Sequence, residues 1–173
     1  KNDGIIYTRG NSKAIDKLEH ITILSENFNY NKKLNIINAQ KNVEINDEKK
    51  DSKIIGEDIT YKRTIEEIFS KDETTISLEK KYKFYSTNVL FNRNKMELSS
   101  FDKSLVLDNE NNKYEFENFL YNINDELLKA YNINVTTNDI QNSKKKDQYF
   151  FSDGFFNFKN QNFNASKTEI TLH

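Results

Sequence analysis

Apolar residues alternate with polar ones along most of the chain, in short runs that are separated by polar steps. Phe28 and Tyr30 flank an asparagine, and Ile59 and Tyr61 flank a threonine. A period of two places the apolar side chains on one face of a β-strand. Polar steps such as residues 31–33 then reverse the chain, as in a hairpin. The pattern therefore predicts short antiparallel strands joined by tight turns.

These runs form a repeat with a period of 30 or 31 residues, in which an apolar anchor precedes an aromatic residue by two positions. The first four anchors are Phe28, Ile59, Val89 and Phe119. A small residue follows each anchor after eleven positions, at Ala39, Ser70, Ser100 and Ala130. One copy cannot bury its apolar face alone, so successive copies are expected to stack around a continuous interior. The repeat predicts an all-β sandwich or jellyroll.

A fifth, imperfect copy has its anchor at Phe155, 36 positions after the fourth. The extra length falls around Asn142–Asp147, a polar stretch that indicates a loop insertion. A second irregularity is Asn124–Tyr131, where Leu127 and Leu128 have the propensity of a short helix. The corresponding segments of the other copies alternate as strands do, so we predict a strand here, with a helical turn as the alternative.

Composition fits one folded domain and narrows the classes of partner. The 173 residues are 35% hydrophobic and 13% aromatic, which is enough for a core. Lysine and arginine total 26 against 27 acidic residues, so no basic field is expected to attract nucleic acid. The chain has no cysteine, and no run approaches the roughly 18 apolar residues of a spanning helix. We expect a single domain over residues 1–173, excised from a longer chain.

Motifs for catalysis or metal binding are sparse. The two histidines, His20 and His173, are too far apart to predict a metal site by spacing. The four glycines are scattered and form no phosphate-binding loop. Neighbouring carboxylates such as Glu66 and Glu67 lie in polar turns, where solvated charge is the commoner explanation. We therefore predict no metal site, no cofactor and no enzymatic activity.

Several segments resemble a known family. Asn42–Ile45 followed by Gly56–Tyr61 is similar to the recurring small, acidic, apolar, x, Tyr pattern of the OstA-like β-jellyroll domains of lipopolysaccharide transport. Met96–Ser100, Tyr149–Phe156 and Ala165–His173 resemble the last turns of the N-terminal periplasmic domain of LptD-type proteins. The resemblance covers roughly residues 5–173 and rests on positions shared by LptA, LptC and LptD types. Some LptD-type members have cysteines that tie this domain to their barrel, and this sequence has none.

The resemblance implies an incompletely closed β-jellyroll whose hydrophobic groove receives the acyl chains of lipopolysaccharide. It implies end-to-end docking with an LptA-like periplasmic jellyroll by β-augmentation, with Ile5–Tyr7 and Phe163–Leu172 as candidate edges. An outer-membrane barrel and its lipoprotein plug are further implied partners, and the implied location is the periplasm, tethered to the outer membrane through a continuation of the chain. The inward residues expected to line the groove are Phe28, Tyr30, Ile59, Tyr61, Val89, Phe91, Phe119, Tyr121 and Phe155.

Two other classes of function stay open. In a structural or adhesive β-solenoid, the same aromatic residues would form a closed core without a lipid ligand. In an enzyme on a β-helix scaffold, surface carboxylates would carry the chemistry. Many further repeats would favour the solenoid, a barrel after His173 would favour the lipid carrier, and a cleft with a carboxylate of raised pKa would favour the enzyme.

Overall fold

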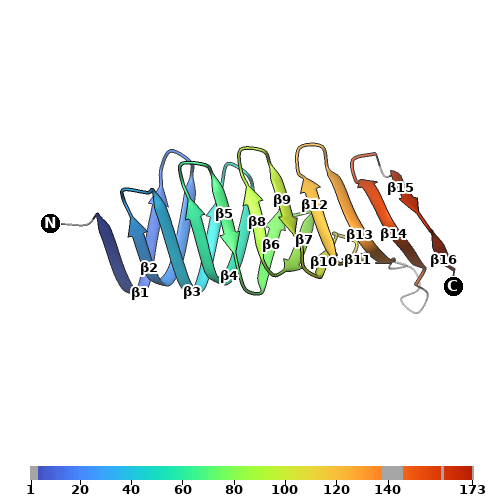
Figure 1. The fold of residues 1–173 in the computed structure, drawn as a ribbon, viewed down its shortest axis with the longest axis horizontal. Coiled ribbons are helices and arrows are strands. Elements are labelled where there is room, and N and C mark those ends of the chain that lie inside the picture. Colours follow the sequence, from blue (N-terminus) through green and yellow to red (C-terminus); the bar gives the residue numbers. More distant parts are fainter. Residues whose placement is uncertain (1–3, 138–145, 161, 173) are drawn as a thin grey trace.

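The computed structural model describes residues 4–137, 146–160 and 162–172, and all the regular structure among them is β-strand (Figure 1). The strands, in chain order, are β1 (Ile5–Asp16), β2 (Ile21–Asn31), β3 (Ile36–Asp47), β4 (Ser52–Lys62), β5 (Glu67–Ser70), β6 (Thr74–Leu78), β7 (Tyr82–Ser86), β8 (Val89–Asn92), β9 (Glu97–Ser100), β10 (Ser104–Leu107), β11 (Lys113–Phe116), β12 (Asn118–Asn122), β13 (Leu127–Thr136), β14 (Gln148–Asn157), β15 (Asn162–Ser166) and β16 (Glu169–Thr171). Every pairing between them is antiparallel. The predicted all-β fold is confirmed.

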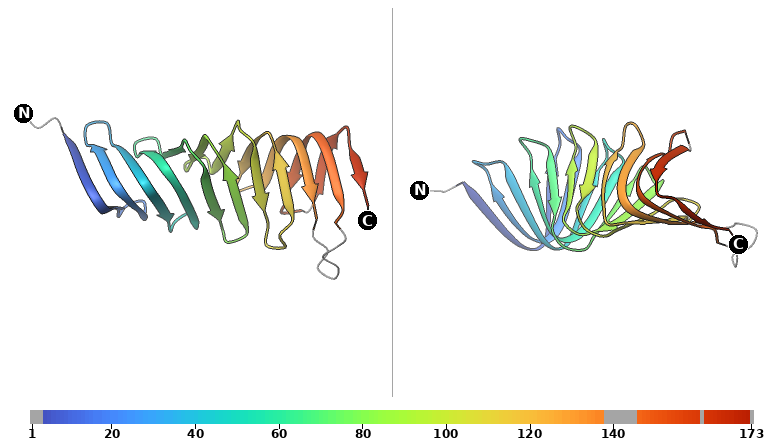
Figure 2. Two further views of the ribbon diagram at one scale, coloured as in Figure 1. Left: turned by 90° about the horizontal axis from the view of Figure 1, so that it is seen from below. Right: turned by 45° about the vertical axis from the view of Figure 1, so that its right-hand side comes forward.

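The sheet divides in two after its first four long strands. The C-terminal half of β4 pairs with β5, which leads through β8 and β9 to β12, while the N-terminal half pairs with β6, which leads through β7 and β10 to β11. Strand β13 pairs with both β12 and β11, and β14 continues from it. The two sheets thus share long, bent strands at both ends of the molecule (Figure 2). This arrangement is an incompletely closed jellyroll, as the resemblance implies.

Small side chains lie where the chain passes from one sheet to the other, along an edge that we call the spine. The hydroxyls of Ser70 and Thr74 lie 2.5 Å apart there, and those of Ser86 and Ser104 lie 2.8 Å apart. A Cβ at Gly56 would lie only 3.0 Å from the Ser70 hydroxyl. Close packing at this bend is the reason that the repeat has a small residue eleven positions after each anchor.

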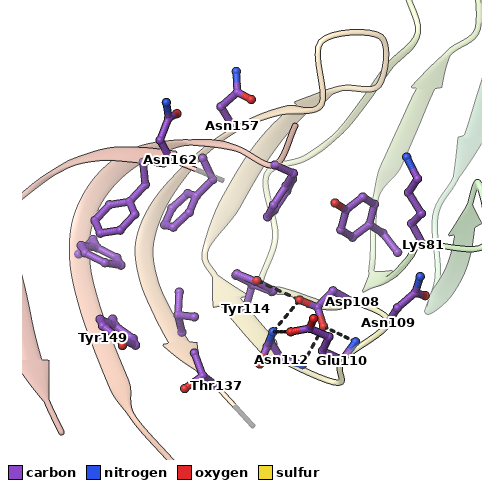
Figure 3. Close-up of a pocket in the computed structure, with 16 residues that line it drawn as sticks. Lys81, Asp108, Asn109, Glu110, Asn112, Tyr114, Thr137, Tyr149, Asn157 and Asn162 are labelled. Carbon is purple, nitrogen blue, oxygen red and sulfur yellow. Dashed lines mark hydrogen bonds between the residues drawn. The ribbon is translucent and has the colours of Figure 1, made fainter. Parts of the chain in front are cut away.

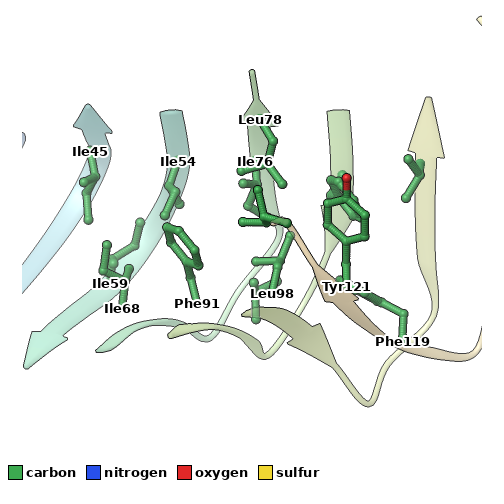
Figure 4. Close-up of a cluster of buried hydrophobic side chains, with 14 of the residues drawn as sticks. Ile45, Ile54, Ile59, Ile68, Ile76, Leu78, Phe91, Leu98, Phe119 and Tyr121 are labelled. Carbon is green, nitrogen blue, oxygen red and sulfur yellow. The ribbon is translucent and has the colours of Figure 1, made fainter. Parts of the chain in front are cut away.

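The apolar faces of the two sheets fill the space between them. Phe91 and Leu98 from one sheet and Ile76 and Phe84 from the other are fully buried, and Figure 4 shows side chains of both sheets meeting. Aromatic rings continue the packing toward the C-terminal end, where the centroids of Phe84 and Phe119 lie 5.5 Å apart. Burial of this kind contributes about 25 cal/mol per Å² of apolar surface. The interior of the middle repeats is therefore a packed core.

Eight of the nine predicted inward residues point inward, and the ninth was predicted in the wrong register. Phe155 is 47% exposed on the outer face, with the Lys129 ammonium 5.3 Å from its ring centroid, while Phe156 is 7% exposed and points inward. The cause is the pairing of β14 with β13, which sets Phe156 opposite Leu128. A shift of one residue along a strand reverses which face each side chain takes.

Two other predictions concern the same region. Leu127 and Leu128 open strand β13, so the prediction of a strand is confirmed over the helical alternative. The loop insertion predicted at 142–147 lies outside the described residues except for its last two positions.

Candidate functional site

Opposite the spine, the hairpin turns of the two sheets face each other in two rows, along an edge that we call the seam. One row includes the turns at 17–20, 48–51, 79–81 and 109–110, and the other the turns at 32–35, 63–66, 93–96, 123–126 and 158–160. Within the second row the N–H of Arg63, Arg93 and Ile123 each donates to the carbonyl of the preceding turn, at 2.8 to 3.0 Å. These positions are therefore equivalent along the seam.

The first seam unit joins the two rows through an ion pair. Arg63 Nε donates to Asp16 Oδ2 at 2.8 Å, and Arg63 Nη1 donates to the Tyr30 hydroxyl at 3.2 Å. The Tyr30 hydroxyl donates in turn to Asn35 Oδ1 at 3.3 Å. The Asp16 side chain is buried and that of Arg63 is 32% exposed. Tyr30, predicted as a groove residue, thus points inward with its ring and reaches the seam with its hydroxyl.

The second unit repeats the same contact one copy later and deeper in the protein. Arg93 Nε donates to Asp47 Oδ2 at 2.6 Å, and both side chains are 1% exposed. Arg93 also pairs with Glu66, and the Tyr61 hydroxyl donates to Glu66 at 3.1 Å. Glu19 lies at the edge of the group, with Oε2 3.6 Å from Arg93 Nη1. Burial raises the pKa of Tyr61 to about 12, so its hydroxyl stays protonated and can donate at neutral pH.

The third unit has the same four positions but no charge. Phe91, Met96, Ile123 and Leu78 stand where the second unit has Tyr61, Glu66, Arg93 and Asp47. Phe91, Leu78 and Ile123 are buried, and Met96 packs against the core. The seam therefore changes from ionic to apolar between two consecutive repeats.

A cavity of about 600 Å³ lies at the C-terminal end of the interior, beyond the third unit (Figure 3). Aromatic rings form most of its wall, from Tyr82, Tyr114, Tyr149, Phe151, Phe156, Phe158 and Phe163. Its polar side is held by Asp108, whose Oδ2 accepts from the Tyr114 hydroxyl at 3.1 Å and from Asn112 Nδ2 at 2.9 Å. Burial, followed by the charge of Asp108, raises the pKa of Tyr114. The cavity combines an apolar wall with a polar rim.

A second cavity, of about 500 Å³, lies at the N-terminal end between β1 and the seam. Its apolar wall includes Ile6, Ala14, Ile21, Ile23, Phe28 and Ile37. Lys13, Lys17 and Arg63 also line it, against the one carboxylate of Asp16. This cavity is therefore apolar inside and carries an excess of positive charge.

The nine predicted groove residues are divided among three surroundings. Phe28, Tyr30 and Tyr61 line the N-terminal cavity. Ile59, Val89, Phe91, Phe119 and Tyr121 are buried in the packed part of the interior, and Phe155 is on the outer face. The wall of the C-terminal cavity includes none of the nine.

Sequence reasoning missed the charged residues of the seam. The chain has three arginines against 23 lysines, and two of the three occupy equivalent positions of the repeat, at Arg63 and Arg93. The occurrence of arginine at these two equivalent places, in a chain that uses lysine almost everywhere else, is a signal that could have indicated them. Their planar guanidinium groups suit fixed pairing with a carboxylate better than lysine does.

The first seam unit predicts a dependence of stability on pH. Burial raises the pKa of Asp16, but the hydrogen bonds from Arg63 and from two backbone N–H groups, together with the charge of Arg63, outweigh it and hold the pKa below its usual value. Such a carboxylate stabilises the fold fully above its unfolded-state pKa of about 4 and loses this effect as the pH falls through the lower folded-state value. We expect Asp16→Asn to flatten the fall in unfolding free energy below about pH 4, measured by urea titration at several pH values. The same fall in unfolding free energy below about pH 4 in the parent and in Asp16→Asn would contradict this assignment.

Neither a metal centre nor a spanning helix is found in the described part of the chain. Among residues 4–137, 146–160 and 162–172, no group of three or more His, Cys, Asp or Glu side chains is placed to hold a metal ion. Over the same residues there is no helix of the length and apolarity needed to cross a membrane.

Comparison with known proteins gives a likeness to solved structures. No protein-family model and no curated protein matches the chain. Among solved structures, the chain is similar to the crystal structure of LptH, the LptA-homologous periplasmic component of the lipopolysaccharide transport device of Pseudomonas aeruginosa. The alignment covers 100% of this chain and 99% of that one, with 10% sequence identity and a TM-score of 0.33. A likeness at this level does not define a family or a function for the chain.

Proposed function

We propose that this protein is a periplasmic carrier of lipopolysaccharide, which holds the acyl chains between its two sheets. The observation that carries the proposal is an apolar interior that ends in a cavity at each end, of about 600 and 500 Å³. Cavities of roughly 300 to 1,000 Å³ with apolar walls and a few polar groups are typical of ligand sites. The role requires binding and release, and no catalytic step.

The chemistry of the cavities suits an amphiphile. Each buried methylene of an acyl chain contributes about 0.8 kcal/mol, so about a dozen carbons are worth on the order of 10 kcal/mol. Lys13, Lys17 and Arg63 at the N-terminal cavity favour an anionic head group, such as the phosphates of a lipid A moiety. Polar groups around Asp108 at the other cavity favour the uncharged, hydroxyl-rich part of a glycolipid.

The proposed carrier docks end to end with an LptA-like jellyroll through its terminal strands. Strand β1 pairs with β2 along one side, and β15 and β16 pair with β14. Their outer edges offer backbone N–H and C=O groups to an added strand. The candidate edges Ile5–Tyr7 and Phe163–Leu172 fall within these terminal segments. In this proposal an outer-membrane barrel and its lipoprotein plug lie further along the same route, with the chain tethered to that membrane through its continuation.

One observation favours a second candidate, the structural β-solenoid with a closed core. The middle of the interior is filled by side chains such as Phe91, Leu98 and Ile76, which are fully buried. A solenoid without a ligand needs no more than this. The two candidates differ in whether the terminal cavities take up lipid.

Photo-crosslinking in cells separates the two candidates. A photoreactive residue replaces Phe158, which lines the C-terminal cavity, or Ile21, which lines the N-terminal one. Phe155 on the outer face serves as the control. We expect lipopolysaccharide adducts at positions 158 and 21 and none at 155, because acyl chains occupy the cavities. Folded, well-expressed protein that gives no adduct at either cavity would leave the closed solenoid as the better account.

A further inference from the structure

All four side chains of the seam unit change together between the second unit and the third. The second unit consists of Tyr61, Glu66, Arg93 and Asp47, all joined by hydrogen bonds or ion pairs. The third unit replaces all four with apolar residues and is equally buried at the positions of the ion pair, Ile123 and Leu78. Closing the seam therefore does not require charge, and the ionic units need another explanation.

The two kinds of unit differ in the cost of opening them. An ion pair loses favourable hydration when it is buried, and this loss offsets most of the attraction between the charges. When the seam opens at an ionic unit, water solvates the separated groups and restores that hydration. When the seam opens at the apolar third unit, the side chains of Phe91, Ile123 and Leu78 are exposed to water, and nothing repays the loss of their burial. The ionic units are thus the part of the seam that opens at least cost.

The ionic units also form one wall of a cavity. Tyr30, Arg63 and Asp16 of the first unit and Tyr61 of the second line the N-terminal cavity. Separation of Arg63 from Asp16 and of Arg93 from Asp47 would extend this cavity sideways between the two sheets. The third unit would then mark where the opening stops, because its buried Phe91, Ile123 and Leu78 fill the space between the two rows of turns.

We propose that the two ionic seam units form a latch, which opens sideways to admit acyl chains into the N-terminal half of the interior, while the apolar third unit stays closed. This inference rests on the proposed function for the identity of the lipid. The opening of the latch itself is a property of the protein alone, and it can be measured without lipid.

The turns beside the seam offer matched positions for spin labels, since the chain has no cysteine of its own. Glu48 and Asn94 directly follow Asp47 and Arg93 of the second unit, and both are exposed. Glu79 and Asn124 directly follow Leu78 and Ile123 of the third unit and are exposed in the same way. The variant Glu48→Cys/Asn94→Cys therefore reports on the ionic second unit. The variant Glu79→Cys/Asn124→Cys reports on the apolar third unit from the equivalent positions.

Electron-spin distance measurements on the two labelled proteins test the latch. For the second unit we expect a distribution with an additional longer distance, whose share grows when Asp47→Asn weakens the ion pair. For the third unit we expect one narrow distance that Asp47→Asn does not change. A narrow distance at the second unit with and without Asp47→Asn, in protein whose circular dichroism is that of the parent, would overturn the latch.

Cross-linking the same pairs connects the latch to lipid. A short bis-maleimide across positions 48 and 94 holds the second unit closed, and the same reagent across 79 and 124 is the control. We expect the first bridge to lower loading of purified lipid A, read by photo-crosslinking at position 21, by about tenfold, and the control bridge to leave it unchanged. Equal loading with both bridges would refute the latch and leave the carrier role intact. Absence of loading in the unbridged protein would refute the carrier role, and the distance measurement would still decide whether the latch opens.

Discussion

Replacing Arg93 alone with isoleucine is expected to lower the free energy of unfolding by about 3 to 5 kcal/mol. The change leaves Asp47, which is 1% exposed, and the partly buried Glu66 facing each other with no cation between them. Removing one partner of a buried ion pair is costly because the remaining charge is desolvated without compensation. Urea or guanidinium unfolding followed by circular dichroism measures the loss.

Converting the whole second unit to the residues of the third is expected to restore this stability. The variant Tyr61→Phe/Asp47→Leu/Glu66→Met/Arg93→Ile carries the residues that close the seam one repeat later. Apolar replacement of a complete buried ionic group is often neutral or stabilising by about 1 to 4 kcal/mol. We therefore expect the fourfold variant to be at least as stable as the parent, and a fourfold variant as unstable as the single one would contradict this view of the seam.

The first seam unit supplies a matched control for the size of the effect. Arg63 makes the same contact with Asp16, but its side chain is 32% exposed against 1% for Arg93, so its removal opens the buried Asp16 carboxylate to water. Ion pairs open to solvent contribute about 0 to 1 kcal/mol. Arg63→Ile is therefore expected to lower the free energy of unfolding much less than Arg93→Ile.

The proposed latch predicts that the fourfold variant also takes up less lipid in its N-terminal half, because its seam has lost the unit that opens.

The sequence contains enough information to predict the fold because its strongest signal is periodic. A strand has an apolar residue at every second position, and stacking requires each copy to repeat the same layout, so anchors such as Ile59 and Val89 recur at a constant interval. Buried positions such as Tyr61, Phe91 and Tyr121 follow from that alternation alone. The small residue in each copy can also be found in the sequence. The reason for it, which is the close packing at the spine, is seen only in the folded chain.

The seam could not be predicted in the same way, because its contacts join residues that are far apart in the sequence. Arg63 and Asp16 are separated by 47 positions, and Arg93 and Asp47 by 46. Each of these residues lies in or beside a polar turn, where a charged side chain is ordinarily solvated. Only the meeting of the two rows of turns makes them partners, and that meeting depends on how far the two sheets close.

The position of Phe155 shows a different limit. Periodicity of two gives the same pattern in either register when aromatic residues are consecutive, and both Phe155 and Phe156 fit an inward position. The spine decides between them, since Gly154 pairs with Ala130 on one side and Ala165 on the other. A Cβ at Gly154 would lie 3.2 Å from the Ala165 Cβ, so a small residue is favoured there. With residue 154 facing inward at the spine, Phe156 must face inward as well.

Alanine substitution of these two neighbours is expected to give very different losses of stability. Phe156→Ala should lower the free energy of unfolding by about 3 kcal/mol or more, because the ring is buried and its removal leaves a void. The centroids of the Phe151 and Phe163 rings lie 5.6 and 5.8 Å from that of Phe156, so these rings lose their packing partner. Phe155→Ala removes an exposed ring whose contact with Lys129 is worth about 0.5 to 1 kcal/mol.

Chemical unfolding of the two variants side by side measures the difference, and each protein is the control for the other. The Phe156 ring also lies in the wall of the C-terminal cavity, so Phe156→Ala enlarges the space for an acyl chain. Lipid A at saturating concentration binds the folded state, so it should restore part of the unfolding free energy that Phe156→Ala loses. For Phe155→Ala, lipid A should raise the unfolding free energy only as much as it does for the parent protein. Equal losses of stability in the two variants would contradict the assignment of the Phe156 face of β14 to the interior. They would also contradict the cavity wall to which Phe156 belongs.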